Sequence, residues 1–295
     1  MASSDRYDII FDMETNDPDD FVTLLFLLGH PKVNLKCLTL VPGTPDQIGF
    51  IRFVLNRFNR GDLPLGVFNM QSKPALAKFH LNFYPNESIG ESTDAEDASQ
   101  LIYKYSNEKT ILICGGPLKN VAKAVEIDGF QLGRLVAQGG FAGDNIVPKQ
   151  KRLPKFDGRI TCQTFNLCAD LQAAQIVLNC QNIKEKYFVS KNVCHGVVYN
   201  RQTHSQLQHI YQHSQSLTEI YRVMSIYLQK KQEKIFHDPL AACCAIDLSI
   251  GQWKHVQLYL DDKTKQWGSR ISDQPNVFII IDYDQHKYIS TLFQY

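Results

Sequence analysis

Short apolar runs alternate along the chain with longer segments of helical periodicity. Runs rich in β-branched and aromatic residues predict strands at 7–11, 35–41, 110–114, 134–138, 186–190 and 277–283. Apolar residues at helical spacing predict helices at 20–29, 46–58 (with Asp46 as N-cap), 117–125, 169–178 and 204–232, and a further helix from Asp238. Strands that alternate with helices predict a mainly parallel, twisted α/β sheet flanked by helices, in a Rossmann-like arrangement.

The length and composition favour one globular unit. The chain has 295 residues, of which 44% are hydrophobic and 21% charged, as is usual for a soluble globular protein. No linker, repeat or low-complexity tract divides it, so we expect a single domain over residues 1–295.

The charge, hydropathy and cysteine content limit which binding partners and which cellular compartment we expect for the protein. A net charge of +1 gives no reason to expect nucleic acid or an anionic membrane as a partner. No segment approaches the length of a membrane span, and the N-terminus lacks the apolar core of a signal peptide. The eight cysteines include no CxxC pair, so they are typical of the reduced core of a cytoplasmic protein.

A dense acidic stretch, DMETNDPDD, follows the first predicted strand. Its five carboxylates are Asp12, Glu14, Asp17, Asp19 and Asp20. Ligands of parallel α/β sheets bind beyond the carboxyl ends of strands, where this stretch would lie. Like charges held so close need a shared proton or a cation, and a hard divalent ion prefers carboxylate oxygens. The stretch therefore predicts a metal site; a solvated acidic loop is the alternative.

Several motifs resemble one enzyme family. DMETNDPDD is similar, with one extra residue, to the DxDPGxDD signature of the inosine–uridine-preferring nucleoside N-ribohydrolases. Four further segments resemble family motifs in the family's order, namely ICGGPLKNVAKAV (113–125), AQGG (137–140), TFNLCADLQAA (164–174) and KNVCH (191–195), and a fifth, FHDPLA (236–241), matches almost letter for letter. The resemblance runs from about residue 7 to residue 245 and identifies the chain as a divergent member.

The resemblance implies a nucleoside hydrolase fold and a calcium-dependent enzyme. Such an enzyme hydrolyses the N-glycosidic bond of a small-molecule nucleoside or related ribosyl compound, giving free base and ribose, and a homo-oligomer is possible. The implied metal ligands are Asp20, Asp238, a backbone carbonyl near Gly115 and a first carboxylate that also acts as general base. One inserted residue brings Glu14 to this last position, with Asp17 as the alternative; Asp17 could instead cap the next helix.

The resemblance also implies substrate-binding residues. Asp19 and Asn166 fall at ribose-binding positions, and Asn145 is a further ribose-side candidate. His237 falls where a histidine donates a proton to the departing base. Tyr221 would lie against the base, and His80 would belong to a mobile loop.

Two departures from the family pattern keep other functions open. Thr164 replaces a glutamate that contacts the 5′ side of ribose, and a basic insertion precedes it, with Lys149, Lys151, Arg152, Lys155 and Arg159. Together they predict a substrate with an anionic 5′ substituent such as phosphate, unless the insertion is only a solvated lid. With Glu14 also replacing an aspartate, a non-catalytic ribosyl-ligand binding protein is the second alternative. A phosphatase with a DxD nucleophile would explain neither FHDPLA nor TFN.

Overall fold

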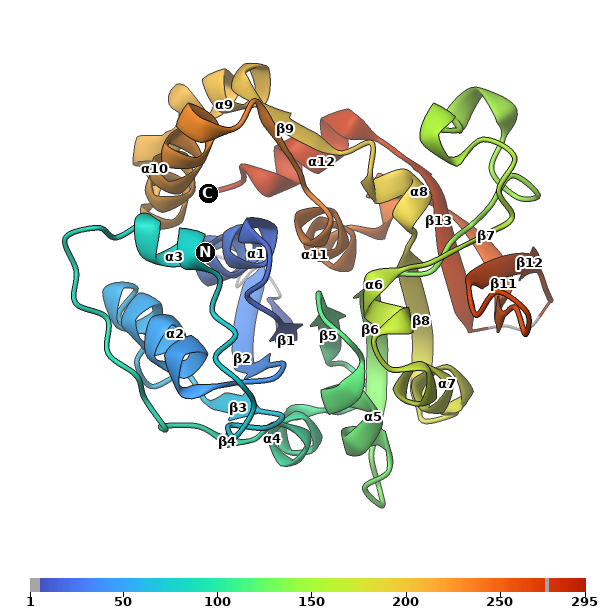
Figure 1. Ribbon diagram of the computed structural model, residues 1–295, viewed down its shortest axis with the longest axis horizontal. Helices are drawn as coiled ribbons and strands as arrows, with labels where there is room; N and C mark the ends of the chain where they lie inside the picture. The colour runs from blue at the N-terminus through green and yellow to red at the C-terminus, as the bar shows by residue number, and fades with distance from the viewer. Residues whose placement is uncertain (1–5, 274–275) are drawn as a thin grey trace.

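The computed structural model describes residues 6–273 and 276–295, and one large sheet crosses it (Figure 1). Within these residues the strand order is β4-β3-β2-β1-β5-β6-β8-β13-β11-β12-β7. The strands are β1 (Tyr7–Met13), β2 (Val33–Leu40), β3 (Leu65–Val67), β4 (Glu96–Asp97), β5 (Ile111–Cys114), β6 (Leu132–Gln138), β7 (Thr161–Cys162), β8 (Ile183–Val189), β11 (Gly251–Leu260), β12 (Trp267–Ile271) and β13 (Val277–Tyr283). A separate pair is formed by β9 (Val198–Asn200) and β10 (Glu233–Ile235).

Helices cover both faces of the sheet. They are α1 (Pro18–Gly29), α2 (Pro45–Arg57), α3 (Lys78–Asn82), α4 (Ala98–Tyr105), α5 (Lys119–Val125), α6 (Phe165–Cys168), α7 (Leu171–Asn179), α8 (Lys191–Cys194), α9 (Arg201–Gln208), α10 (Gln215–Lys230), α11 (Asp238–Ile246) and α12 (Gln285–Leu292). Short 3₁₀ turns are η1 (Lys149–Lys151), η2 (Pro154–Phe156), η3 (Tyr211–His213) and η4 (Leu248–Ile250). Helices α1, α2, α10, α11 and α12 enclose one apolar core, whereas α4, α5 and α7 enclose the other.

The parallel half of the sheet places the acidic stretch at a break in strand order. Strand β1 pairs in parallel with β2 on one side and with β5 on the other, and the chain progresses outward from β1 in opposite directions. Loops that leave the carboxyl ends of β1 and β5 therefore separate and leave a crevice. Residues 14–17 and the glycines after β5 lie in these loops.

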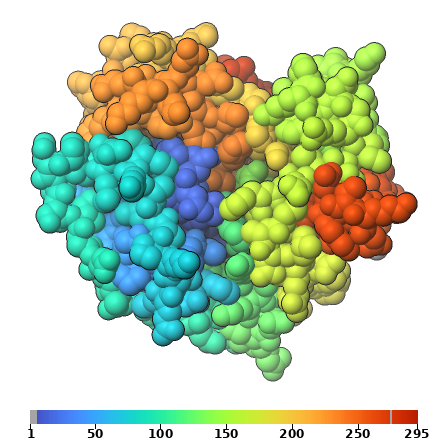
Figure 2. Space-filling view, in the orientation of Figure 1, coloured from blue at the N-terminus to red at the C-terminus, as the bar shows by residue number. Residues whose placement is uncertain are grey.

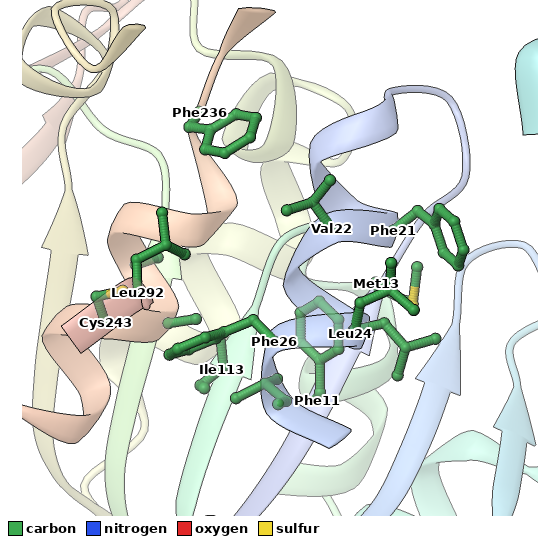
Figure 3. Close-up of a cluster of buried hydrophobic side chains, with 14 of the residues drawn as sticks. Phe11, Met13, Phe21, Val22, Leu24, Phe26, Ile113, Phe236, Cys243 and Leu292 are labelled. Atoms are coloured by element: carbon green, nitrogen blue, oxygen red, sulfur yellow. The ribbon is translucent and has the colours of Figure 1, made fainter. Parts of the chain in front are cut away.

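Two buried helices fix the walls of this crevice. Helices α1 and α11 pack against each other over the central strands, and their apolar side chains interlock (Figure 3). Helix α11 is buried throughout, and its small residues, AACCA at 241–245, let its backbone approach the sheet. Burying one Leu or Phe side chain contributes about 1.5–3 kcal/mol, so this packing holds both helix N-termini firmly. The carboxylates at those N-termini are thereby held against each other.

The structure corrects two details of the predicted elements. The helix predicted over 204–232 is wrong as a single unit, because it divides into α9, η3 and α10. Ser214 is extended and its side chain accepts a hydrogen bond from the backbone N–H of Leu217, which starts a new helix. Helix α2 begins after Thr44 rather than Asp46, whose carboxylate accepts from the N–H of Leu76 instead. The antiparallel edge β11-β12-β7 was not predicted.

The cysteines and helices agree with the expectations for the core. All eight cysteines are unpaired, and most are buried. Within the described ranges, none of the helices combines the length and the apolar character needed to cross a membrane.

Candidate active site

A pocket of about 290 Å³ opens at the carboxyl ends of β1 and β5. In the space-filling view, the N-terminal segment in blue, the segment before α11 in orange and the segment around α6 in yellow-green meet at a hollow (Figure 2). The lining residues are Glu14, Asn16, Asp17, Asp19, Asp20, Gly115, Gln138, Thr164, Phe165, Asn166, Lys191, His195, His237 and Asp238. The structure thus brings together segments separated by more than 200 positions in the sequence.

Three buried carboxylates form the floor of the pocket. Oxygens of Asp19, Asp20 and Asp238 all lie within 4.8 Å of one another. Burial, and then the negative charge of Asp238, raises the pKa of Asp20 well above its usual range. Burial, and then the charges of Asp19 and Glu14, raises the pKa of Asp238 in the same way. Oδ1 of Asp238 is buried without a hydrogen-bond partner. An acceptor-only cluster with an orphaned oxygen fits a bound cation.

Glu14 and Gly115 border the same cluster. Burial, and further the charges of Asp17 and Asp19, raise the pKa of Glu14 to about 7, although a hydrogen bond from Asn16 opposes the shift. A Cβ on Gly115 would lie 3.0 Å from Cγ of Asp238 and 3.1 Å from Oδ1 of Asp20. The backbone at Gly115 therefore abuts both carboxylates, and a side chain there would intrude on the cluster.

Asp19 differs from its neighbours because internal groups satisfy it. Its Oδ2 accepts the backbone N–H of His237 at 2.7 Å and of Asp238 at 3.2 Å. Nζ of Lys234 lies 3.1 Å from Oδ1 of Asp19 and 2.9 Å from Oδ1 of Asp17. Burial, the largest single cause, would raise the pKa of Asp19, but the charges of Lys234 and His237 and the hydrogen bonds with Asp17 and Lys234 together lower that pKa. Asp19 ties the start of α11 to the start of α1.

Asp12, the first carboxylate of the stretch, does not line the pocket. It is fully buried in β1, and its Oδ1 accepts from the hydroxyl of Thr39 at 2.6 Å and from Nδ2 of Asn120 at 2.7 Å. Burial raises its pKa to about 6, with these hydrogen bonds opposing the shift. Asp12 joins β1 to its neighbours just below the site.

The TFN segment supplies the opposite side of the pocket. Nδ2 of Asn166 donates to the carbonyl of Gly115 at 2.8 Å and to Oε1 of Gln138 at 2.9 Å. The side-chain oxygen of Thr164 is buried and has no hydrogen-bond partner. Asn166 therefore orients the Gly115 carbonyl, while the Thr164 hydroxyl is left for a ligand.

His237 lies between the acidic cluster and a thiol. Its Nδ1 is 3.2 Å from Sγ of Cys194. Burial raises the pKa of Cys194 to about 12, so the thiol keeps its proton, and its Sγ donates to the backbone carbonyl of Lys191 at 3.6 Å. The same sulfur is the neighbour of Nδ1 of His237. Burial, partly opposed by Asp19, lowers the pKa of His237 to about 4, which keeps the ring neutral near pH 7.

Three predicted substrate residues lie away from the pocket, and for them the structure gives no substrate contact. Nδ2 of Asn145 donates to the backbone carbonyl of Ser269 at 2.7 Å, which ties the loop to β12. Tyr221 stacks between His204 and Tyr211 on α10, with ring centroids 4.4 Å from each. Packing between helical segments accounts for the position of the tyrosine, and its contact with the base stays a prediction.

His80 is likewise a core residue. Its ring is fully buried against Phe21, Phe50 and Phe79, and burial lowers its pKa to about 3. The predicted mobile-loop role is therefore not what the structure shows.

The basic insertion is largely engaged outside the pocket. Lys151 pairs with Asp282 at 2.7 Å, and Arg152 pairs with Asp144 at 3.4 Å. Only Lys155 reaches the pocket wall, where its Nζ contacts Nδ1 of His195. For Lys151 and Arg152 these contacts agree with the alternative of a solvated lid.

Lys191, His195 and Phe165 are pocket residues that the sequence reasoning did not single out. Lys191 and His195 are the first and last residues of the KNVCH segment, which follows β8. Phe165 is the exposed middle residue of TFN. For Lys191 and His195, the position after the carboxyl end of the parallel strand β8 was the available signal, and for Phe165 it was the TFN motif.

Comparisons with known proteins agree with this fold. The model of the inosine-uridine preferring nucleoside hydrolase family matches residues 9–290. A plant nucleoside hydrolase superposes with a TM-score of 0.71 at 20% identity, over 97% of this chain and 98% of that one. An inosine-uridine preferring nucleoside hydrolase from Bacillus anthracis gives 0.70 at 18% identity, over 97% of each chain. No curated protein sequence matches the chain significantly.

The fold and the acidic pocket define an N-glycosyl hydrolase of the nucleoside hydrolase class. The chain belongs to the inosine-uridine preferring nucleoside hydrolase family, because the family model matches nearly its whole length.

Proposed function

We propose that the protein hydrolyses the N-glycosidic bond of a ribonucleoside, or of a related ribosyl compound, with the help of calcium. The observation that carries this proposal is the meeting of Glu14, Asp20 and Asp238 with His237 in one pocket. Hydrolysis of such a bond passes through an oxocarbenium-like transition state. A wall of buried carboxylates stabilises positive charge that develops on the ribose.

The metal would be held by Asp20, Asp238, Glu14 and the carbonyl of Gly115. Their oxygens suit a hard cation, and the neighbouring Asp19 already has Lys234 as its counter-charge. Glu14 is favoured over Asp17 as the first ligand because Lys234 also neutralises Asp17. When bound, calcium would supply a positive charge that orients a water and the ribose diol and acidifies the water.

The chain's own residues divide the remaining work. Glu14 takes the proton of the attacking water, since its carboxylate lines the pocket beside the acidic cluster. His237 donates to the departing base, as a hydrogen-bond donor when its ring is neutral and as a proton donor when both ring nitrogens carry a proton. Asp19 and Asn166 both line the pocket and bind ribose hydroxyls. The Asp19 carboxylate accepts hydrogen bonds from them, and the Asn166 amide can donate or accept.

The competing function is a binding protein that has lost turnover. Its support was the replacement of two family acids, at Glu14 and Thr164. Glu14 still places a carboxylate at the cluster, and His237 is retained beside it. These two observations favour catalysis.

The test is the release of free base by the purified protein from a panel of nucleosides, nucleotides and dinucleotides. We expect turnover with calcium and its loss on chelation. Asp238→Asn should abolish turnover and lower calcium affinity in calorimetry, whereas Asp128→Asn, at an exposed position remote from the pocket lining, should change neither. Tight ribose binding without release of base from any substrate would instead favour the binding protein.

A further inference from the structure

The side of the pocket formed by the TFN and KNVCH segments carries two lysines that form no salt bridge among the described residues. Lys191 lines the pocket, and its Nζ donates to the carbonyl of Gln163 at 2.8 Å. Lys155 contacts His195, a second lining residue. Among the described residues neither lysine forms a salt bridge, although Lys151 and Arg152 of the same insertion both do.

These cations lie close enough to influence one another. Burial, which is the largest cause, and further the charge of Lys191 lower the pKa of Lys155. Burial, and then the charges of His237 and both lysines, lowers the pKa of His195 to about 3. Gathering positive groups at one wall costs free energy unless an anion offsets it. No carboxylate of the described residues lies within salt-bridge distance of either lysine, so the anion would come from a ligand.

An orphaned hydroxyl independently marks the same place. Oγ1 of Thr164 is buried, lines the pocket and has no hydrogen-bond partner. It follows directly after Gln163, whose carbonyl anchors the Lys191 ammonium. A buried hydroxyl without a partner costs about 1–3 kcal/mol, which a hydrogen bond to a ligand would recover.

We propose that Lys191 and Thr164, with Lys155 and His195 beside them, bind a phosphate carried by the ribosyl substrate. The proposal rests on the proposed function in one respect, namely that the carboxylate side of the pocket holds the ribose. A phosphate on the 5′ carbon is the anionic group in question. Its three terminal oxygens accept several charge-assisted hydrogen bonds at once, which matches an ammonium and a hydroxyl offered from one wall.

The pocket would therefore be bipolar. Carboxylates hold the cation and the ribose at one side, and lysines hold the phosphate at the other. The same acidic wall would repel a phosphate placed the other way round, so the two walls also fix the direction in which the substrate enters.

The test uses calorimetry on the full chain with calcium present. D-ribose 5-phosphate should bind about 10- to 150-fold more tightly than D-ribose, the range expected for a charge-assisted hydrogen bond. Lys191→Gln should remove most of this difference and leave the affinity for D-ribose unchanged. Lys191→Arg should retain part of it, because the charge remains. Lys149→Gln is the matched control, since Lys149 is exposed in the same insertion and does not line the pocket.

Substrate kinetics locate the anion. A nucleoside 5′-monophosphate should show a lower KM than its nucleoside, and Lys191→Gln should raise that KM with little change in kcat. A nucleoside whose base carries a carboxylate should gain nothing. If the carboxylated base gains and the 5′-phosphate does not, the cations serve the leaving group and the proposal is wrong.

The failures of the two proposals are distinguishable. Turnover of neutral nucleosides, with no preference for phosphate or with equal losses in Lys191→Gln for both ligand types, would overturn the phosphate site and leave the hydrolase intact. Binding of D-ribose 5-phosphate that depends on Lys191, with no turnover of any riboside, would support the phosphate site and overturn hydrolysis.

Discussion

Two pairs of carboxylates in the acidic stretch differ in whether a cation of the protein lies beside them. Asp17 and Asp19 share the ammonium of Lys234, at 2.9 and 3.1 Å. Glu14 and Asp20 have no cation within the described protein, and they are crowded by Asp238 from α11. The pKa of Asp19 is consequently lowered, whereas those of Glu14 and Asp20 are raised.

This difference separates structural charge from functional charge. A buried carboxylate with an internal cation is satisfied in the folded protein, and here it joins two helices. A buried carboxylate without one stays costly until a proton or a metal arrives. Adjacent carboxylates can therefore differ in whether they are free to bind a metal, and the position of one lysine decides between them.

The largest expected effect comes from removing the proposed base. Glu14→Gln keeps the shape of the side chain but removes its charge, so kcat should fall by about 10²–10⁴-fold. Steady-state kinetics with saturating calcium measure this loss, and calorimetry measures any accompanying loss of calcium affinity. A variant with near-parental kcat would assign the base to another group.

Removing the internal cation should mainly destabilise the fold. Lys234→Met leaves the buried Asp19 uncompensated, and breaking one side of a buried pair costs about 3–5 kcal/mol. Urea unfolding with calcium present measures the free energy of unfolding. Lys230→Met, at an exposed position on α10, is the control and should stay within about 0.5 kcal/mol of the parent.

The unpaired carboxylates predict an unusual pH dependence without metal. Their folded-state pKa values lie above the unfolded values, so the folded state holds extra protons and loses stability as pH rises through those pKa values. Between pH 6.5 and 8 in chelator, these carboxylates should lower the free energy of unfolding by about 1.4 kcal/mol per pH unit for each proton that the folded state holds and the unfolded state has lost.

The buried histidines act in the opposite direction at the low end of this window. The pKa values of His30 and His80 are lowered by burial to about 4 and about 3, so the folded rings are neutral, whereas unfolded histidines still bind protons near pH 6.5 and make stability rise with pH there. Asp238→Asn keeps this histidine contribution and should flatten the fall caused by the carboxylates, and calcium should abolish that fall because it binds the ionised carboxylates. A metal-free parent whose stability falls no more steeply than that of Asp238→Asn would contradict the assignment.

The smallest effect is expected at Asp17. Its side chain is 43% exposed, so its pair with Lys234 is worth at most about 1 kcal/mol. Asp17→Asn should change kcat by less than about threefold and leave calcium affinity intact. A loss as large as that of Glu14→Gln would exchange the roles assigned to these two residues.

Much of the parallel half of the fold was predictable from the sequence. The apolar run 277–283 is β13 to the residue, and 7–11 lies inside β1, because buried parallel strands are continuously apolar. The antiparallel edge was missed because β11 mixes exposed and buried positions and carries no strong apolar run. The division of 204–232 depends on one capping serine within a continuous polar-apolar pattern.

Site residues that belong to the recognised motifs were predictable from the sequence. Residues whose surroundings depend on contacts between distant segments were not. Glu14, Asp20, Gly115, Asn166 and Asp238 line the pocket as the motifs indicated. His80, Asn145 and Tyr221 do not, because their environments are set by packing against elements far along the chain.

The sequence by itself determined the alternation of strands and helices, the acidic stretch after the first strand and the family to which the chain belongs. Only the tertiary structure decided which carboxylates are neutralised, since Lys234 lies 215 positions after Asp19 yet is 3.1 Å from it. It likewise decided that Lys191, rather than most of the basic insertion, faces the pocket. The physical reason is that periodicity and local spacing set secondary structure, whereas burial and Coulomb energy depend on distances that exist only once the chain has folded.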